Sequence, residues 1–177
     1  MLKIFSTQMN GIFKKITDEE EFSLEDAGRL LAQAGIGEGK IYIYGLKEMK
    51  GILHEALEGK EPFPYAEEFA ETALEMGKEN RFLIFSRHSD DVAAVKLAGQ
   101  LREADLPFVA VSSVKKEKDS VEDLVSLADV HIDLKIQRGL IPDESGERFG
   151  YPYLMAALYA YHGIKFTLEE ILKEYEE

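Results

Sequence analysis

The chain has 177 residues, of which 45% are hydrophobic and 31% charged, a composition typical of a globular domain with a sizeable core. Its 34 acidic and 21 basic residues give a formal net charge of −13, which argues against a nucleic-acid partner because neutralising phosphates requires a basic surface. The absence of cysteine excludes disulfides, thiolate catalysis and cysteine-ligated metal centres.

The N-terminal stretch MLKIFSTQMNGIFKK lacks the apolar core of a signal peptide, and no run approaches the roughly 20 apolar residues of a membrane span. We therefore expect a cytoplasmic protein that does not associate with membranes. No repeat or change of composition divides the chain. We expect a single domain over residues 1–177, with N-terminal helices in 1–36, an α/β core in 40–134, and a C-terminal loop and helices in 135–177.

The start of the chain predicts two helices and a strand. Apolar side chains recur at helical spacing from Leu2 to Ile16, and the acidic run 18–21 then interrupts the pattern. A capping-box pattern beginning at Ser23 starts a second helix, which a series of glycines ends. An apolar strand follows over residues 41–44.

The rest of the chain alternates between helical and strand patterns. A helical stripe follows Gly45, whereas residues 65–80 are ambiguous and fit either a helix over 66–76 or a short strand near Phe69. Clearer signals come next, in the order strand 81–86, helix 92–104, strand 108–112, helix 121–127 and strand 130–134. The C-terminal part reads as a turn at 143–146, a helix over 153–162 ended by Gly163, and a short helix capped by Thr167.

The strands on either side of helix 92–104 are uniformly apolar, as in a parallel sheet buried on both faces. The order of elements predicts a three-layer αβα sandwich whose parallel, doubly wound sheet has about five strands, in the flavodoxin-like class. Ligands bind at the carboxyl ends of the strands in such folds. The turns 45–51 and 86–91 are therefore the expected places for a site.

The second of these turns carries four polar side chains, Ser86, Arg87, His88 and Ser89. Two hydroxyls, a guanidinium and an imidazole before a helix suit a phosphorylated ligand. In the alternative interpretation, Asp90 or Asp91 caps the helix and the basic side chains face solvent, because carboxylates at a helix N-terminus oppose an anion.

The first turn, GLKEMKG, lacks the spacing of a P-loop or dinucleotide fingerprint. Its Gly45, Lys47 and Lys50 suit either contact with an anionic group or an ordinary surface turn.

Three histidine and glutamate side chains are candidates for proton transfer. His54 and Glu58 lie one helical turn apart, which suits acid–base chemistry but is also common on solvent faces. His162 ends an apolar helix, where a cation interacts favourably with the helix dipole even without a catalytic role. The histidines show no metal-binding spacing, so we expect neither a metal nor another cofactor.

The order of elements, with FLIFSRHSDDVAAVKLAGQL, LPFVAVSSV and LADVHIDL, resembles the sugar isomerase (SIS) domain over roughly residues 24–163. The stretch LIPDESGERFGYPYLMAALYAYHG is similar to that of a small bacterial family of SIS-like proteins without an assigned activity, and more distantly to phosphoheptose isomerases. The resemblance implies a phosphosugar ligand and a homo-oligomer, either a dimer or a tetramer.

Matching the residues to the family pattern gives a mixed result. Ser86 falls on the first serine of the Ser-rich phosphate loop, whereas His88 and Ser89 replace the serine and glycine that follow. By resemblance to phosphoheptose isomerases, Glu58 is the candidate base, with His54 beside it, and His162 is the candidate second acid–base group.

Three functional hypotheses follow. The first is a phosphosugar-binding protein, with aldose–ketose isomerase activity as its stronger form. The second is a catalytically silent SIS-like sensor or interaction module that has lost the phosphate loops. The third is a flavodoxin-like protein that binds a nucleotide or flavin, for which the chain offers the fold class but no fingerprint.

Overall fold

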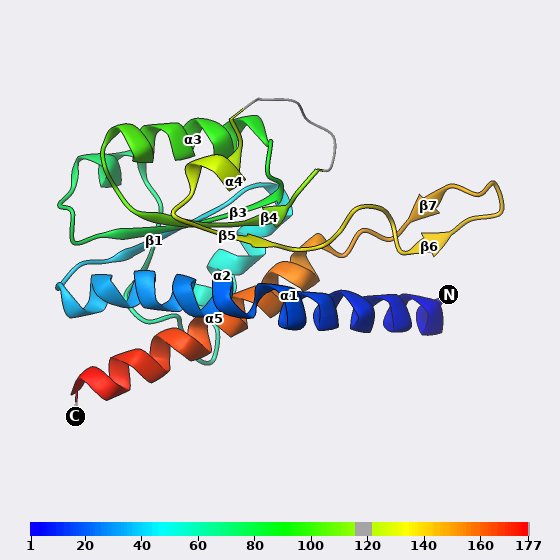
Figure 1. Ribbon diagram of the computed structural model, residues 1–177, viewed down its shortest axis with the longest axis horizontal. Coiled ribbons are helices and arrows are strands. Elements are labelled where there is room, and N and C mark those ends of the chain that lie inside the picture. The colour runs from blue at the N-terminus through cyan, green and yellow to red at the C-terminus, as the bar shows by residue number, and fades with distance from the viewer. Residues whose placement is uncertain (116–121, 177) are drawn as a thin grey trace.

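A computed structural model describes residues 1–115 and 122–176 of the chain and shows three layers, with a parallel sheet between two layers of helices (Figure 1). The sheet has the strand order β2-β1-β3-β4-β5. Its strands are β1 (Ile41–Gly45), β2 (Ala66–Glu68), β3 (Arg81–His88), β4 (Phe108–Ser113) and β5 (Val130–Asp133). The predicted αβα sandwich with a five-stranded parallel sheet is therefore confirmed.

Each face of the sheet has its own helices (Figure 1). One layer contains α1 (Leu2–Ile36), α2 (Lys50–Glu58) and α5 (Tyr153–Glu176). The other contains α3 (Val92–Glu103) and the single turn α4 (Leu124–Leu127). The 3₁₀ turns η1 (Lys47–Met49) and η2 (Glu71–Glu75) follow β1 and β2. The small hairpin of β6 (Ile141–Pro142) and β7 (Arg148–Phe149) projects past the sheet beside the N-terminal half of α1.

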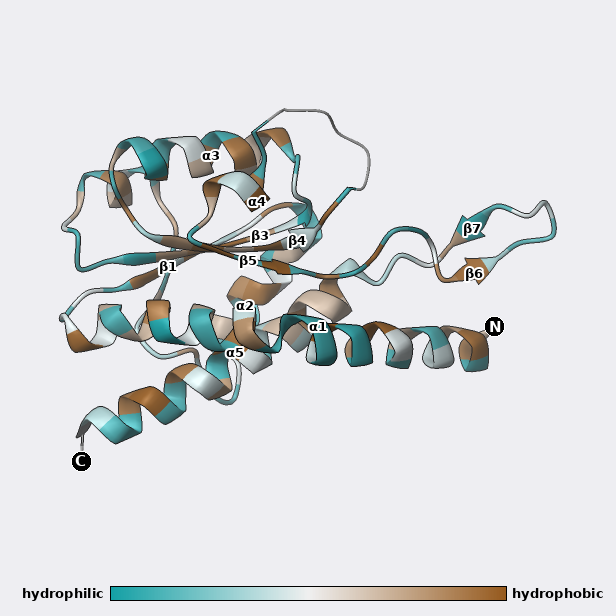
Figure 2. Cartoon of the chain, viewed as in Figure 1, coloured by the Kyte–Doolittle hydropathy of each residue, from teal (hydrophilic) through white to brown (hydrophobic). Residues whose placement is uncertain are grey.

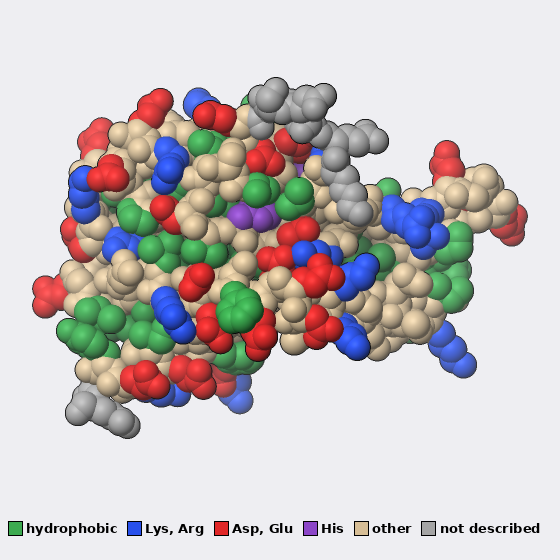
Figure 3. All heavy atoms as spheres, viewed as in Figure 1, with side chains coloured by type: hydrophobic (Ala, Val, Ile, Leu, Met, Phe, Trp, Pro, Cys, Tyr) green, Lys and Arg blue, Asp and Glu red, His purple; other side chains and the backbone are tan. Residues whose placement is uncertain are grey.

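Two apolar clusters hold the layers together, one on each face of the sheet. Alternate residues of a strand point to opposite faces, so Ile43 and Phe85 pack against α1, α2 and α5, whereas Phe82 and Ile84 pack towards α3 and α4. The central strands β1, β3 and β4 are consequently hydrophobic over most of their length, while the helices carry both hydrophobic and polar residues (Figure 2). Acidic side chains, with Lys and Arg among them, are spread over the face seen in Figure 3.

The N-terminal helix is continuous, so the expectation of two helices separated by the acidic run 18–21 was wrong. The reason lies in tertiary contacts of that run. Glu20 is buried and its carboxylate pairs with Nζ of Lys135 at 2.5 Å, and Glu19 pairs with the same ammonium at 3.1 Å. Glu19 and Glu20 therefore form ion pairs with the loop after β5, and the helix continues through them.

The C-terminal helix is also continuous, which corrects the expected end at Gly163 and the expected cap at Thr167. A Cβ atom on Gly163 would lie 3.2 Å from Leu24, so the glycine allows α5 to approach α1 closely. The Thr167 hydroxyl donates to the Gly163 carbonyl at 3.4 Å, a bond within the helix rather than a cap. Gly163 here serves helix packing, not helix termination.

The ambiguous region 65–80 contains the short strand β2 followed by the 3₁₀ turn η2, so the alternative of a helix over 66–76 was wrong. Strand β3 runs two residues further than expected and includes Arg87 and His88. We expected a helix over 121–127. Residue 121 lies outside the described residues, and in the described part the helix spans Leu124–Leu127. Among the described residues, no helix is both long and apolar enough to cross a membrane.

Candidate functional site

The sheet reverses its strand order between β1 and β3, where a ligand site is expected in this class of fold. Gly45 at the end of β1 is paired with Phe85, and β3 continues beyond this pair to His88. A cleft of about 450 Å³ opens here, which is a size typical of small-molecule sites. We call it the switch-point cleft and define it by its lining residues Glu48, Arg87, His88, Tyr151 and Tyr153.

An ion pair forms one wall of the switch-point cleft. Nε of Arg87 donates a hydrogen bond to Oε1 of Glu48 at 2.6 Å, joining the end of β3 to the turn after β1. This hydrogen bond is the main reason that the pKa of the Glu48 carboxyl is lowered. Both partners are therefore charged at neutral pH, and both side chains remain about one-third exposed, at 39% for Arg87 and 32% for Glu48.

His88 and Tyr153 form the second wall. The Tyr153 hydroxyl lies 3.3 Å from Nε2 of His88, and the two rings meet edge to face with centroids 5.2 Å apart. Burial is the main cause that lowers the pKa of His88 and raises the pKa of Tyr153, so both groups are neutral at pH 7. Nδ1 of His88 is buried without a hydrogen-bond partner among the described residues.

A pair of stacked tyrosines extends this wall towards solvent. The rings of Tyr151 and Tyr153 are nearly parallel, with an interplanar angle of 6° and centroids 5.8 Å apart. Tyr153 is buried and Tyr151 is exposed, so one aromatic ring remains accessible at the mouth of the cleft. The cleft thus offers a guanidinium, a carboxylate and an aromatic surface, which together suit a small ligand with polar and apolar sides.

The two predicted serines are buried and are not among the residues that line the cleft. Ser86 is fully buried, and its hydroxyl donates to the carbonyl of His88 at 2.8 Å. Ser89 is also buried, and its backbone N–H donates to the Ser113 carbonyl. These contacts hold the irregular end of β3, whose pairing with β4 shifts register between Phe85 and His88. A ligand-binding role for either serine remains a prediction.

Asp91 occupies the N-cap position of α3, as the alternative interpretation expected, but its side chain makes no capping hydrogen bond to the helix. Its carboxylate instead accepts a hydrogen bond from the backbone N–H of His88 at 3.3 Å. A carboxylate therefore lies at the N-terminus of α3, where backbone N–H groups would otherwise be suited to bind a phosphate.

Gly45 and Lys47 line a different cavity. This edge cleft, as we call it, has a volume of about 470 Å³ and lies at the carboxyl ends of β1 and β2, between Tyr44, Lys47, Lys50, Glu68 and Phe69. Lys47 has a φ of 56°, a left-handed conformation that is uncommon for a residue with a side chain. The 3₁₀ turn η1 separates the two clefts, with Glu48 on one side and Lys47 on the other.

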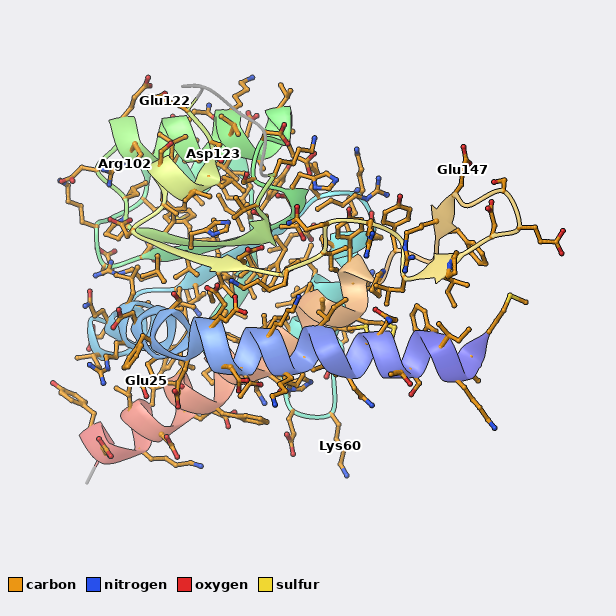
Figure 4. All side chains as sticks on the ribbon, turned by 45° about the vertical axis from the view of Figure 1, so that its right-hand side comes forward. Glu25, Lys60, Arg102, Glu122, Asp123 and Glu147 are labelled. Atoms are coloured by element: carbon orange, nitrogen blue, oxygen red, sulfur yellow. The ribbon has the colours of Figure 1, made fainter. Side chains whose placement is uncertain are left out.

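The three acid–base candidates are not among the residues that line the switch-point cleft. His54 and Glu58 are exposed on α2, and Glu58 belongs to its last turn, roughly 12 Å along the helix from Lys50. The side chain of Lys60, just beyond that helix, points away from the sheet (Figure 4). His162 lines a groove of about 320 Å³ between α1 and α5, which we call the interhelix groove, together with Thr17, Leu24, Tyr159 and Phe166.

Sequence reasoning missed three residues of the switch-point cleft, namely Glu48, Tyr151 and Tyr153. Glu48 lies in the GLKEMKG turn that was already singled out, but no pattern in that turn shows which way a side chain faces. The two tyrosines lie in the stretch FGYPYL, whose local signal is only the proline before a helix. Their approach to β3 depends on where α5 starts. Among the described residues, no group of three or more His, Asp or Glu side chains is placed to hold a metal ion.

Comparisons with known proteins identify relatives along the whole chain. The family model described as "Domain of unknown function (DUF2529)" matches residues 1–172. A protein of Bacillus subtilis (strain 168), described as "Uncharacterized protein YwjG", is 46% identical over 175 residues, which are 99% of both chains.

Solved structures with low sequence identity share the fold. A putative phosphosugar isomerase involved in capsule formation from Bacteroides fragilis has a TM-score of 0.61 and 13% identity, over 99% of this chain and 92% of the other. A putative sugar-phosphate isomerase from Listeria monocytogenes has a TM-score of 0.58 and 16% identity, over 99% and 90%. The sugar isomerase domain of an RpiR transcription factor from Sphaerobacter thermophilus has a TM-score of 0.55 and 12% identity, over 96% of both. The predicted SIS-like fold is therefore confirmed.

Proposed function

Because this chain belongs to the DUF2529 family and has the fold of SIS-domain proteins, we propose that it binds a phosphosugar or a related phosphorylated metabolite in the switch-point cleft. The observation that carries the proposal is the position of Arg87. Its guanidinium lines a cleft of suitable volume at the carboxyl end of β3, where the strand order reverses. The B. fragilis neighbour, named as a putative phosphosugar isomerase, and the L. monocytogenes neighbour, named as a putative sugar-phosphate isomerase, support this ligand class.

We propose binding rather than turnover within one protomer. Aldose–ketose isomerisation needs a base within hydrogen-bond reach of the substrate carbon acid. The candidates Glu58 and His162 lie outside the switch-point cleft, on the exposed side of α2 and in the interhelix groove. Isomerase activity therefore requires these groups from a second copy of the chain, or other groups in their place.

A homo-oligomer is the second part of the proposal. The exposed surface of the interhelix groove is mainly apolar, although Glu21 and Glu25 also line it, and the exposed side chains of Tyr159 and Phe166 border it. A second copy of the chain would cover this surface in a dimer.

A silent sensor or interaction module is the rival function, and one observation favours it. The groups expected to hold a phosphate already have partners within the chain, since Arg87 pairs with Glu48 and the Ser86 hydroxyl bonds to a carbonyl. The S. thermophilus neighbour is the sugar isomerase domain of a transcription factor, so this fold also occurs in regulatory proteins.

A thermal-shift and calorimetric titration with glucose 6-phosphate, ribose 5-phosphate and the two unphosphorylated sugars separates these functions. A ligand at one hundred times its dissociation constant adds about 2.7 kcal/mol of stability, which corresponds to a rise in Tm of roughly 5–10 °C for a chain of this length. We expect such a rise with at least one phosphosugar and none with the free sugars.

Two matched variants locate the binding. Arg87→Gln should abolish the shift, whereas Arg102→Gln should retain it. Arg102 lies at the other end of the sheet, on the last turn of α3, and pairs with Asp129 (Figure 4). No shift with any phosphosugar would favour the silent module, and equal losses in both variants would refute the assigned cleft.

A further inference from the structure

The two oxygens of the Glu48 carboxylate have different surroundings. Oε1 accepts the hydrogen bond from Arg87 at 2.6 Å. Oε2 is buried and has no hydrogen-bond partner among the residues that the structure describes. An ionised carboxylate has about four acceptor positions, and a buried acceptor without a donor loses free energy comparable to a lost hydrogen bond. The hydrogen bond from Arg87 is therefore the main interaction that stabilises the Glu48 carboxylate, and Oε2 keeps acceptor positions that no described residue fills.

An anion that approaches Arg87 meets this carboxylate. Glu48 competes with it for the same guanidinium, and the two negative charges repel each other in a partly desolvated cleft. Release of Arg87 to a bare anion would also leave Glu48 without its only hydrogen bond to a charged donor among the described residues. A ligand that brings only a negative charge is thus opposed twice.

A ligand that carries hydroxyl groups beside its anionic group avoids this opposition. Its hydroxyls donate to Glu48 while its anionic group engages Arg87, so neither charged side chain is left unpaired. The terminal torsion of a glutamate is broad, which lets either carboxylate oxygen turn to the cleft. The exposed ring of Tyr151 at the mouth of the cleft can cover the apolar face of such a ligand.

We propose that Glu48 is a specificity-determining residue of the switch-point cleft, which selects polyhydroxylated phosphate esters and rejects bare anions and alkyl phosphates. This inference rests on the proposed function, because it assumes that phosphosugars bind beside Arg87. It also explains why the cleft proposed to bind an anion contains a carboxylate, in a chain whose net charge of −13 already disfavours anions. The carboxylate lowers the affinity for every anion, and only a donor-bearing ligand offsets that loss.

The test compares ribose 5-phosphate, n-butyl phosphate and inorganic phosphate by isothermal titration of the full chain. The wild-type protein should bind ribose 5-phosphate at least tenfold more tightly than n-butyl phosphate. A tenfold ratio corresponds to about 1.4 kcal/mol, the scale of one hydrogen bond. Glu48→Gln should reduce the ratio to within about threefold, and it should strengthen the binding of n-butyl phosphate and inorganic phosphate.

Two further variants separate selectivity from damage to the fold. Glu48→Ala should reduce the ratio in the same direction, because it removes the charge without adding an amide donor. Glu67→Gln should leave the ratio unchanged. Glu67 lies on the outer strand β2, pairs with Lys40 and does not line the cleft. A change of selectivity in folded protein is not expected from a purely structural role of Glu48.

The outcomes distinguish failure of the specificity role from failure of the proposed function. If the wild-type protein binds ribose 5-phosphate through Arg87 and both Glu48 variants keep the wild-type ratio, the specificity role is overturned while the proposed function stands. If neither ribose 5-phosphate nor glucose 6-phosphate binds the wild-type protein, both are overturned. A ratio that collapses in the Glu48 variants alone supports both.

Discussion

Gly45 passes so close to Met49 that a Cβ atom on the glycine would overlap the Met49 carbonyl oxygen. This approach allows β1 to lead directly into η1, the turn that carries Glu48 to the switch-point cleft. Gly45→Ala should therefore destabilise the protein by roughly 1–3 kcal/mol, the usual cost of overpacking. It should also weaken the thermal response to a phosphosugar, because the turn must move. Urea unfolding and thermal shift measure the two effects.

Gly99→Ala is the matched control. Gly99 lies within α3, and an added Cβ would have no atom within 4 Å among the described residues. The variant should be more stable than the wild type by about 1 kcal/mol, since alanine favours a helix over glycine by that amount. Equal losses of stability in both variants would contradict the close-approach argument at Gly45.

The sheet was predictable because its signals are local. Uniformly apolar strands separated by helical patterns indicate a buried parallel sheet, and this signal does not depend on contacts with residues far away in the sequence. The helix ends were less predictable because distant residues determine them. Glu20 tolerates its place in a continuous α1 because Lys135 pairs with it, and Gly163 continues α5 because Leu24 packs over it. Neither partner can be inferred from the residues around the apparent break.

The site was predictable in position and less so in composition. The turns after β1 and β3 were expected to meet, since carboxyl ends of parallel strands share one edge of the sheet. Arg87 and His88 do line the cleft, but Ser86 points into the protein because the strand continues two residues further than its apolar run. Tyr153 was invisible to pattern reasoning, because only the packing of α5 brings it to His88.

A buried lysine on α5 gives an asymmetric prediction. Only 2% of the Lys165 side chain is exposed, and its ammonium pairs with Glu169 at 3.1 Å and with the largely exposed Glu61 at 3.8 Å. Among the described residues, Glu169→Gln leaves the buried ammonium paired with Glu61 alone at 3.8 Å, so we expect a loss of about 2 kcal/mol in the free energy of unfolding. Lys165→Met removes the buried charge itself and should stay within about 1 kcal/mol of the wild type.

Urea unfolding at pH 7 compares these two variants directly. The informative quantity is the difference between them, because both break the same ion pair. A loss in Lys165→Met as large as that in Glu169→Gln would show that the pair itself, rather than the desolvated lysine, governs stability here.

The interhelix groove leads to a prediction about assembly. The side chains of Tyr159 and Phe166 are 38% and 59% exposed beside an apolar groove of about 320 Å³. If a second copy covers this surface, Phe166→Glu should convert the oligomer to monomers, because it places a charge in an apolar contact. Light scattering coupled to gel filtration measures the mass. Val92→Glu is the control, since Val92 is 84% exposed at the start of α3. A wild-type monomer at tens of micromolar would refute the proposed dimer.

The last prediction concerns His131 and acid stability. Its Nε2 lies 2.8 Å from the hydroxyl of the buried Ser112, and burial lowers the pKa of His131 from 6.5 to about 4. The folded state therefore resists a proton that the unfolded chain binds readily below pH 6.5. This contribution to stability is complete above the unfolded pKa and is lost as pH falls through 6.5 towards 4. A shift of this size corresponds to about 3 kcal/mol.

His131→Gln retains an amide that can bond to Ser112 but does not titrate. Between pH 7 and pH 4.5, the wild-type protein should lose roughly 2–3 kcal/mol more of its unfolding free energy than the variant, as the linkage between proton binding and folding requires. His54→Gln makes the same substitution on an exposed helix surface and should follow the wild type. Parallel pH profiles for wild type and His131→Gln would show that His131 is protonated in the fold without cost, which its desolvated position beside Ser112 argues against.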